Sequence, residues 1–185
     1  HPEGFPWIAA FLTGALLSRT LDRPDLITID MGGTSSDICL IEGGTPKVST
    51  ECEIGGHPIK LPMIDINTIG AGGGSIARID AGGALRVGPE SAGAVPGPVC
   101  YGRGGTEPTV TDAHAVLGRI NPFSLLGGSM PLCVQDARSA IRDRIARPLG
   151  MEVEQAAEGI LEEVTATMLR GIRRVSVERG HDPRE

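Results

Sequence analysis

Glycine is the residue that most limits how this chain can fold. The 185 residues include 27 glycines, and 21 of these lie between residues 30 and 130. This is about twice the usual share, and each glycine loses much conformational entropy when it is fixed. Aromatic residues make up only 3% of the chain, so Val, Ile, Leu and Ala must supply most of the core. The central region therefore predicts short strands joined by tight glycine turns.

Charge and cysteine content narrow the function classes. Lys and Arg number 17 against 23 Asp and Glu, and the net charge of −6 disfavours a nucleic-acid surface. No apolar run approaches the roughly 20 residues that span a bilayer. Four cysteines match no zinc-ligand spacing, so we expect reduced thiols in a cytoplasmic protein that binds neither nucleic acid nor membrane. They are Cys39, Cys52, Cys100 and Cys133.

The first residues predict an amphipathic helix. The chain opens without an initiator Met, and we expect it to be part of a longer polypeptide. Over residues 5–17, apolar side chains recur at the spacing of one helical face, and Pro6 suits a first turn. We expect that face to be buried in the domain rather than placed in a membrane. Its members are Ile8, Phe11, Leu12, Ala15 and Leu16.

The last third of the chain predicts two further helices, over residues 134–147 and 153–178. The apolar positions of the second follow the helical period. We expect them to form a stripe that is exposed in the isolated chain and promotes self-association. The stripe consists of Val153, Ala156, Ala157, Ile160, Leu161, Val164, Met168 and Ile172.

Two hairpins are predicted between the helices. Residues 26–29 and 38–41 are rich in β-branched side chains and flank a glycine turn. Residues 75–80 and 84–87 flank a second turn.

The segments around these hairpins are less regular. Residues 47–53 and 59–66 predict two more strands. The segment 88–105 is expected to be a long loop that is either functional or disordered. Thr111 is expected to cap a short helix over residues 112–118.

The most specific motif lies in the first hairpin turn, Asp30-Met31-Gly32-Gly33-Thr34-Ser35-Ser36-Asp37. Adjacent glycines let a ligand approach the backbone and point N–H groups at an anion, to which the Thr34 hydroxyl can also donate. Asp30 and Asp37 can hold Mg²⁺ or orient a water. A turn with purely structural glycines explains the same residues equally well.

A second glycine segment, Gly70-Ala71-Gly72-Gly73-Gly74-Ser75, precedes a predicted strand rather than a helix. This context argues against a dinucleotide motif. A phosphate or substrate loop and a backbone crossing that requires glycine are both compatible with it.

Several charged residues are weaker candidates. Arg103 can pair with a phosphate or carboxylate, and Glu107 and Asp112 can serve a metal or act as a base. Exposed loop charges are the simpler interpretation of all three. His57 and His114 are expected to be surface or locally bonded residues.

The whole series of motifs resembles the hydantoinase A family. After the hairpin motif, the resemblance continues through residues 68–77, 88–98, 100–112 and 175–184. The family includes the N-methylhydantoinase A subunit, 5-oxoprolinase, and acetone and acetophenone carboxylase subunits. The similarity runs from about residue 26 to the end of the chain.

This resemblance implies an α/β fold, part of an actin-like (ribonuclease H-like) ATPase lobe with a glycine-rich β insert and C-terminal helices. The expected divisions are residues 1–46 (helix and phosphate-binding hairpin), 47–133 (insert) and 134–185 (helical segment). The implied activity is the opening of a cyclic amide, hydantoin or 5-oxoproline, through a phosphorylated intermediate. ATP and Mg²⁺ are the implied cofactors, and a hydantoinase B-type subunit or domain is the implied partner within an oligomer.

The resemblance also assigns site residues. Asp30 and Asp37 become catalytic groups and metal ligands. The cofactor-binding residues become Gly32, Gly33, Thr34, Gly72, Gly73, Gly74 and Ser75.

Two elements of the family are absent from this chain: its first phosphate motif and the Gly-Gly-Ala-Gly segment that helps to hold adenosine. We therefore expect the isolated chain to bind ATP weakly or not at all and to be inactive. An ATP-dependent ketone carboxylase subunit fits the same motifs. The absence of the two elements also favours a third interpretation, in which the chain is a non-catalytic structural fragment.

Overall fold

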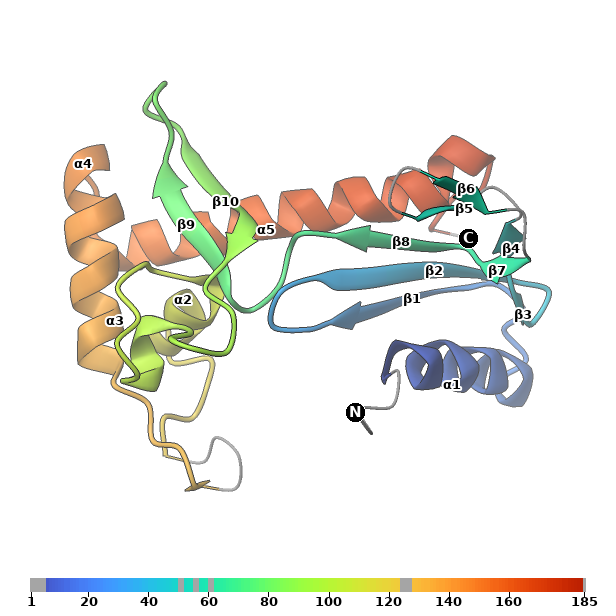
Figure 1. Cartoon of the computed structure of the whole chain (residues 1–185), viewed down its shortest axis with the longest axis horizontal. Helices are drawn as coiled ribbons and strands as arrows, with labels where there is room; N and C mark the ends of the chain where they lie inside the picture. The colour runs from blue at the N-terminus through green and yellow to red at the C-terminus, as the bar shows by residue number, and fades with distance from the viewer. Residues whose placement is uncertain (1–5, 50–51, 55–56, 60–61, 124–127, 185) are drawn as a thin grey trace. The chain divides into compact units, whose positions relative to one another are not determined.

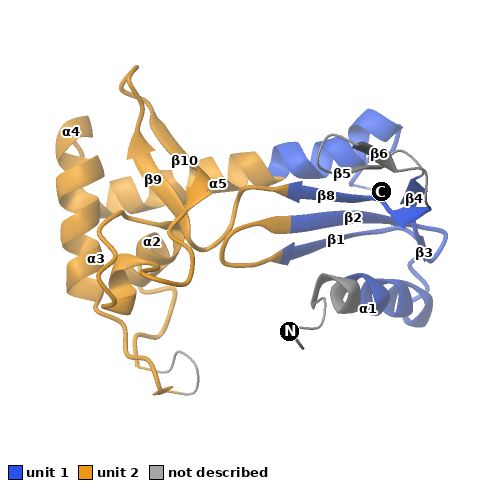
Figure 2. Cartoon of the chain, in the orientation of Figure 1, with its two compact units in different colours: residues 1–30, 37–68, 169–185 blue, residues 31–36, 69–168 orange. Residues whose placement is uncertain are grey.

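The computed structural model describes residues 6–49, 52–54, 57–59, 62–123 and 128–184. Helices and short strands are both present, so the predicted α/β class is confirmed (Figure 1). The chain forms two compact units that alternate along the sequence (Figure 2). Unit 1 comprises residues 1–30, 37–68 and 169–185, and unit 2 comprises residues 31–36 and 69–168.

A four-stranded sheet is the framework of unit 1. Strands β1 (Leu26–Met31) and β2 (Ser36–Glu42) are hydrogen-bonded neighbours joined by the predicted glycine turn, which confirms the first hairpin. Strand β3 (Thr45–Pro46) pairs with the end of β2, and β8 (Ile66–Ile69) pairs with β2 as well. Consecutive residues of β2 from Ile38 to Ile41 are buried, so this central strand carries much of the unit's core.

Two small antiparallel pairs complete the strands of unit 1. Strand β4 (Val48–Ser49) pairs with β7 (Met63–Ile64), and β5 (Cys52–Ile54) pairs with β6 (His57–Ile59). The prediction of continuous strands over residues 47–53 and 59–66 is therefore wrong in its boundaries. Proline cannot donate a ladder hydrogen bond, and Pro62 lies outside both β6 and β7.

Helix α1 (Pro6–Thr20) confirms the first predicted helix but not its buried face. Phe11 and Ser18 are buried, whereas Leu12 and Leu16 are 58% and 65% exposed. A Cβ added to Gly14 would lie 2.5 Å from Thr28 Cγ2, so the helix approaches the sheet through its smallest residue. The side chain of Ile8 lies outside the described residues. None of the described helices is long and apolar enough to span a membrane.

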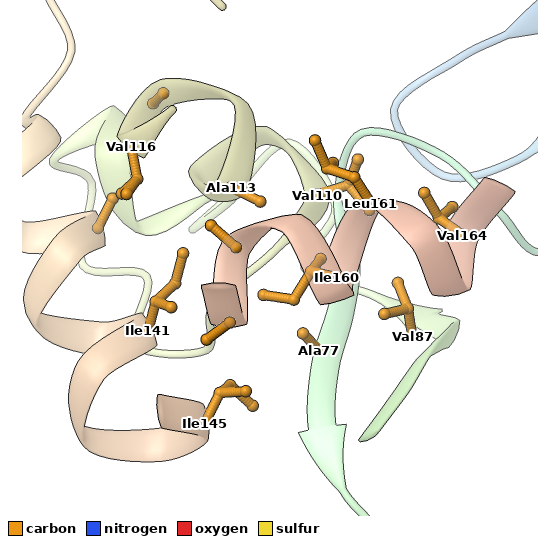
Figure 3. Packing of buried hydrophobic residues seen from close by; sticks show 14 of the residues in the cluster. Ala77, Val87, Val110, Ala113, Val116, Ile141, Ile145, Ile160, Leu161 and Val164 are labelled. Carbon is orange, nitrogen blue, oxygen red and sulfur yellow. The ribbon is translucent and has the colours of Figure 1, made fainter. Parts of the chain in front are cut away.

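Unit 2 is built from a β-hairpin and helices around one apolar cluster. Strand β9 (Ser75–Ile79) pairs antiparallel with β10 (Leu85–Ser91), which confirms the second predicted hairpin. Helices α2 (Val110–Val116), α3 (Val134–Ile141) and α5 (Val153–Val175) contribute to the same cluster. Its members include Ala77, Val87, Val110, Ala113, Ile141, Ile145, Ile160, Leu161 and Val164 (Figure 3).

The apolar stripe of α5 is covered within unit 2 rather than exposed. Ala156, Ala157 and Ile160 have no exposed surface, and Leu161 and Val164 have less than a tenth. The expectation of an exposed stripe on this helix is therefore wrong for these five residues. The helix ends at Val175, and a single 3₁₀ turn, η4 (Val177–Arg179), follows.

The helix predicted over residues 134–147 contains one π turn. It is α-helical in α3, passes through η3 (Arg142–Ala146) and ends in α4 (Arg147–Leu149), before Gly150 at φ 66°. Pro148 has no N–H to donate to the carbonyl of Arg144, so a regular α-helical hydrogen bond is impossible there.

The segment predicted as a long loop, residues 88–105, contains the end of a strand and a short helical turn, and two of its residues bind a buried carboxyl group. Strand β10 extends into it as far as Ser91, and residues 99–101 form a 3₁₀ turn, η1. Asp112 is completely buried and accepts four hydrogen bonds. The donors are the N–H groups of Val99 (3.1 Å), Cys100 (2.7 Å) and Thr109 (2.9 Å), and the Thr109 hydroxyl (2.8 Å).

The residue that caps α2 differs from the prediction. Thr109, not Thr111, is the N-cap, and it forms a reciprocal capping box with Asp112. The helix accordingly begins at Val110, two residues before the predicted start.

Replacing Asp112 with Asn should destabilise the protein by about 2–4 kcal/mol. The amide has the same size but presents N–H₂ where the carboxyl presents an acceptor oxygen, so at least one buried donor loses its partner. Urea denaturation at neutral pH measures this change. Glu162→Ala, on the exposed face of α5, should change the free energy of unfolding by no more than about 0.5 kcal/mol. A similarly small effect of Asp112→Asn would contradict the role given to this carboxyl.

The buried thiol of Cys39 should make stability fall at high pH. Burial, reinforced by the nearby Asp65 carboxylate, raises the pKa of Cys39 from 9.0 to about 11. Between these values the unfolded chain releases the thiol proton and the folded chain keeps it, so unfolding becomes easier as pH rises. Urea denaturation from pH 8 to 11 should show a shallower decline for Cys39→Ala than for the unsubstituted protein. Equal slopes would exclude the effect.

Candidate functional site

The turn of the first hairpin is the exposed part of the strongest sequence motif. It consists of residues 32–35, and the Gly32 N–H donates to the Ser35 carbonyl at 2.8 Å. Gly32, Gly33 and Thr34 are exposed, whereas Ser36 is buried and donates to the Ala71 carbonyl at 2.5 Å. The three residues predicted to bind phosphate are therefore accessible.

The second glycine segment lies directly against this turn. The Gly73 N–H donates to the Gly32 carbonyl at 3.0 Å, and the Gly74 N–H donates to the Gly33 carbonyl at 2.6 Å. A Cβ on Gly72 would lie 2.8 Å from the Gly32 oxygen, closer than real Cβ atoms come. A Cβ on Gly74 would likewise lie 2.9 Å from the Gly33 oxygen, so the close approach of the two backbones requires glycine at positions 72 and 74.

The other groups of this segment are buried or form hydrogen bonds within the protein. Gly72 and Gly74 are buried, and so is Ser75, whose hydroxyl accepts from the Gly72 N–H at 2.9 Å. Thr111 holds Gly73 through two contacts, because both its N–H and its hydroxyl donate to the Gly73 carbonyl at 2.8 Å. These contacts favour a supporting role for Gly72, Gly74 and Ser75 beneath the exposed turn.

Hydroxyl and amide groups surround Thr34. Its hydroxyl lies 3.4 Å from that of Ser91, which in turn accepts from the Gly93 N–H at 3.1 Å. Within the described ranges, no protein acceptor is found for the N–H groups of Gly33 and Thr34. Exposed N–H donors next to two hydroxyls suit an anion such as a phosphate group.

The two aspartates of the motif flank this turn in the sequence and belong to unit 1. Asp30 is the penultimate residue of β1, and Asp37 is the second residue of β2. Both are half-buried. Asp37 accepts a hydrogen bond from the Thr68 hydroxyl at 2.6 Å.

The two aspartates would hold a magnesium ion only together with oxygen ligands from water and a bound phosphate group. In the part of the chain that the structure describes, no three His, Cys, Asp or Glu side chains group closely enough to hold a metal. Mg²⁺ usually binds one or two protein carboxylates and takes its other oxygens from water and substrate phosphates. The two aspartates that flank the turn in the sequence provide carboxylates of this kind.

The weaker sequence candidates have diverse environments. Arg103 is exposed between Gly102 and Gly104, both of which have positive φ. Glu107 forms an ion pair with Arg144 at 2.7 Å, and both side chains are two-fifths or more exposed.

Asp112 is not an exposed loop charge, and His114 is partly buried. The Asp112 carboxyl is buried and saturated with donors, so it is not available to a metal or substrate. The pKa of His114 is lowered, chiefly by burial and then by Arg119. The side chain of His57 lies outside the described residues.

Sequence reasoning missed three residues of this site: Thr68, Ser91 and Thr111. Thr68 belongs to β8, and Ser91 ends β10. Their hydroxyls contact residues between 31 and 57 positions away in the sequence. Nothing in local spacing indicates such pairs.

Comparison with known proteins identifies the chain. The model of the hydantoinase/oxoprolinase family matches residues 6–185. The chain belongs to the hydantoinase/oxoprolinase family. It is 54% identical over 172 residues to the caprolactamase subunit alpha of Pseudomonas jessenii, covering 93% of the chain and 25% of that subunit. The predicted family resemblance is therefore confirmed.

Two further matches extend the comparison. The chain is 42% identical over 180 residues to the acetophenone carboxylase gamma subunit of Aromatoleum aromaticum, covering 96% of the chain and 25% of that subunit. The crystal structure of ATP-dependent caprolactamase from Pseudomonas jessenii matches with a TM-score of 0.87 and 53% identity, over 95% of the chain and 26% of the solved one. The chain thus spans about a quarter of the length of these relatives.

Replacing Gly72 with Ala should displace the hairpin turn and destabilise the protein by about 1–3 kcal/mol. The new methyl group would meet backbone atoms of Gly32 and Thr34 at 2.8 Å, which cannot rotate away as a side chain can. Urea denaturation measures the loss. Gly33→Ala is the matched control, because a Cβ there has no neighbour within 4 Å. Equal stability of the two variants would contradict the close packing of the glycine backbones.

Proposed function

We propose that the protein containing this chain is the ATP-using subunit of a cyclic-amide hydrolase, and that the chain is part of its actin-like nucleotide-binding lobe. The observation that carries the proposal is the exposed turn of Gly32, Gly33 and Thr34, whose N–H and hydroxyl groups suit a phosphate. Membership of the hydantoinase/oxoprolinase family and similarity to an ATP-dependent caprolactamase support it.

The chemistry of amides explains why such an enzyme would use ATP. An amide carbonyl is a weak electrophile, and its oxygen is a poor site for charge to develop. Transfer of the γ-phosphoryl group from ATP to that oxygen releases ADP and activates the carbonyl carbon. Water then attacks this carbon, the ring C–N bond opens and phosphate leaves. Mg²⁺, when bound, would neutralise charge on the transferred phosphoryl group.

The proposal gives each site residue a role. Gly32, Gly33 and Thr34 bind phosphate, and Asp30 and Asp37 hold Mg²⁺ or orient the acceptor. Gly72, Gly73, Gly74 and Ser75 serve the cofactor indirectly, because their contacts set the position of the turn. The substrate class is a lactam or related ring such as 5-oxoproline or hydantoin. A B-type subunit would complete the hydrolysis.

A ketone carboxylase is the second candidate function. The 42% identity to an acetophenone carboxylase subunit favours it specifically. The same phosphoryl transfer would then activate a ketone or bicarbonate for carbon–carbon bond formation. The turn residues would keep the same roles, so the two functions differ only in the acceptor of the phosphoryl group.

Gly33→Ala in the full-length protein should weaken MgATP binding at least about tenfold with little loss of stability. A methyl group there projects into open space from which the phosphate would approach. Isothermal titration calorimetry measures the affinity, and Asp30→Asn and Asp37→Asn should reduce ATP hydrolysis in the same protein. Unchanged MgATP affinity in Gly33→Ala would refute the proposed phosphate site.

The substrate that accepts the phosphoryl group is identified by measuring ADP release from the same full-length protein. Stimulation by caprolactam, 5-oxoproline or hydantoin supports the hydrolase, and stimulation by acetophenone with bicarbonate supports the carboxylase. A folded full-length protein that binds no MgATP would instead leave the chain a structural, non-catalytic module.

A further inference from the structure

Thr68 is the side chain that contacts a proposed catalytic residue most directly. Its hydroxyl donates to Asp37 Oδ1 at 2.6 Å, although 31 residues separate the two in sequence. The contact joins neighbouring strands, since β8 carries Thr68, β2 carries Asp37 and the two strands pair. Both residues belong to unit 1.

The geometry of this contact is that of a strong hydrogen bond. A distance of 2.6 Å lies at the short end for O–H···O pairs and is typical of a carboxylate acceptor. Threonine is branched at Cβ and has few rotamers in a strand, so its hydroxyl is held in one direction. The bond therefore restricts rotation of the Asp37 carboxyl group.

The strand that carries Thr68 is itself anchored on its other side. Asp65 forms an ion pair with Arg179, and the Asn67 side chain donates to the Gly171 carbonyl at 3.3 Å. Successive strand residues point to opposite faces, so Asn67 and Thr68 face in opposite directions. Asn67 of β8 and Asp65, which directly precedes the strand, thus contact the C-terminal segment, while Thr68 contacts Asp37.

Stability alone does not account for a contact of this kind. Thr68 is exposed, and hydrogen bonds between exposed side chains add little to stability because water competes for both groups. Among the described residues, no side-chain hydrogen bond or ion pair is found for Asp30, the other motif carboxylate, whereas Asp37 accepts one from Thr68. Within the described part of the chain, the two carboxylates therefore differ, since a hydrogen bond orients that of Asp37 alone.

We infer that Thr68 is a positioning residue that engages Oδ1 of Asp37 and leaves Oδ2 as the oxygen for the nucleotide-associated metal. The inference rests on the proposed function, in which Asp37 serves Mg²⁺. An oriented carboxylate binds with one oxygen in one direction, which suits the strict octahedral geometry of Mg²⁺. Thr68 itself touches neither metal nor nucleotide and acts through Asp37.

The test compares Thr68→Val and Thr68→Ser in the full-length protein. Valine keeps the shape and strand preference but lacks the hydroxyl, and serine restores the hydroxyl. Calorimetric titration of Mn²⁺ into protein saturated with a non-hydrolysable ATP analogue gives the metal affinity without turnover. Thr68→Val should weaken it about 5- to 20-fold, and Thr68→Ser should return it to within about twofold. Thr45→Val, at an exposed threonine of β3, is the matched control and should change nothing.

Two readouts separate positioning from a structural effect. Thr68→Val should leave the melting temperature within about 2 °C and the metal-free affinity for the analogue unchanged. In an Asp37→Asn background, Thr68→Val should have no further effect on metal affinity. Unchanged metal affinity in Thr68→Val, no recovery in Thr68→Ser, or an equal loss of metal-free nucleotide binding would each overturn the inference.

The failure of this inference is distinct from failure of the proposed function. If Asp37→Asn weakens metal binding and Thr68→Val does not, only the positioning role is wrong. If Asp37→Asn also leaves metal binding unchanged, Asp37 is not a metal ligand, and both assignments fall.

Discussion

The candidate site depends on the contact between two glycine backbones. Gly73 and Gly74 donate their N–H groups to the carbonyls of Gly32 and Gly33, and the space between the chains excludes even a Cβ at Gly72. Because backbone atoms cannot rotate away as side chains can, this contact leaves the turn little conformational freedom. It also leaves the opposite side of the turn, with Gly33 and Thr34, open to a ligand.

One buried carboxyl group extends this support through unit 2. Asp112 accepts hydrogen bonds from the N–H groups of Val99, Cys100 and Thr109 and thereby sets where α2 begins. Thr111, in the first turn of that helix, then holds the carbonyl of Gly73 with two hydrogen bonds. A continuous series of contacts thus links the core of unit 2 to the exposed turn. Because the carboxyl is fully used in this way, it serves the site through structure rather than chemistry.

Relatives with different names and activities share this segment. One is a caprolactamase subunit and another an acetophenone carboxylase subunit, and in each the matching region is about a quarter of the length. Under the proposed function, the region shared with both relatives would serve the ATP-dependent activation step, for which the exposed turn is suited. The groups that distinguish an amide from a ketone would then lie in other parts of the full-length proteins.

The family resemblance implied the α/β class. The sequence by itself determined both hairpins, the existence of the three longer helices and the glycine turn between the first two strands. Each of these follows from local patterns: the helical period, β-branched runs on either side of glycines, and adjacent glycines between two strands. Only the tertiary structure decided that α1 packs through Gly14 and Ser18 rather than through Leu12 and Leu16, because the fit of a small residue against a sheet depends on both surfaces. Only the tertiary structure brought Thr68 to Asp37 and Thr111 to Gly73. A hydrogen bond between residues more than 30 positions apart depends on which strands and loops become neighbours, and the local spacing of residues does not determine that.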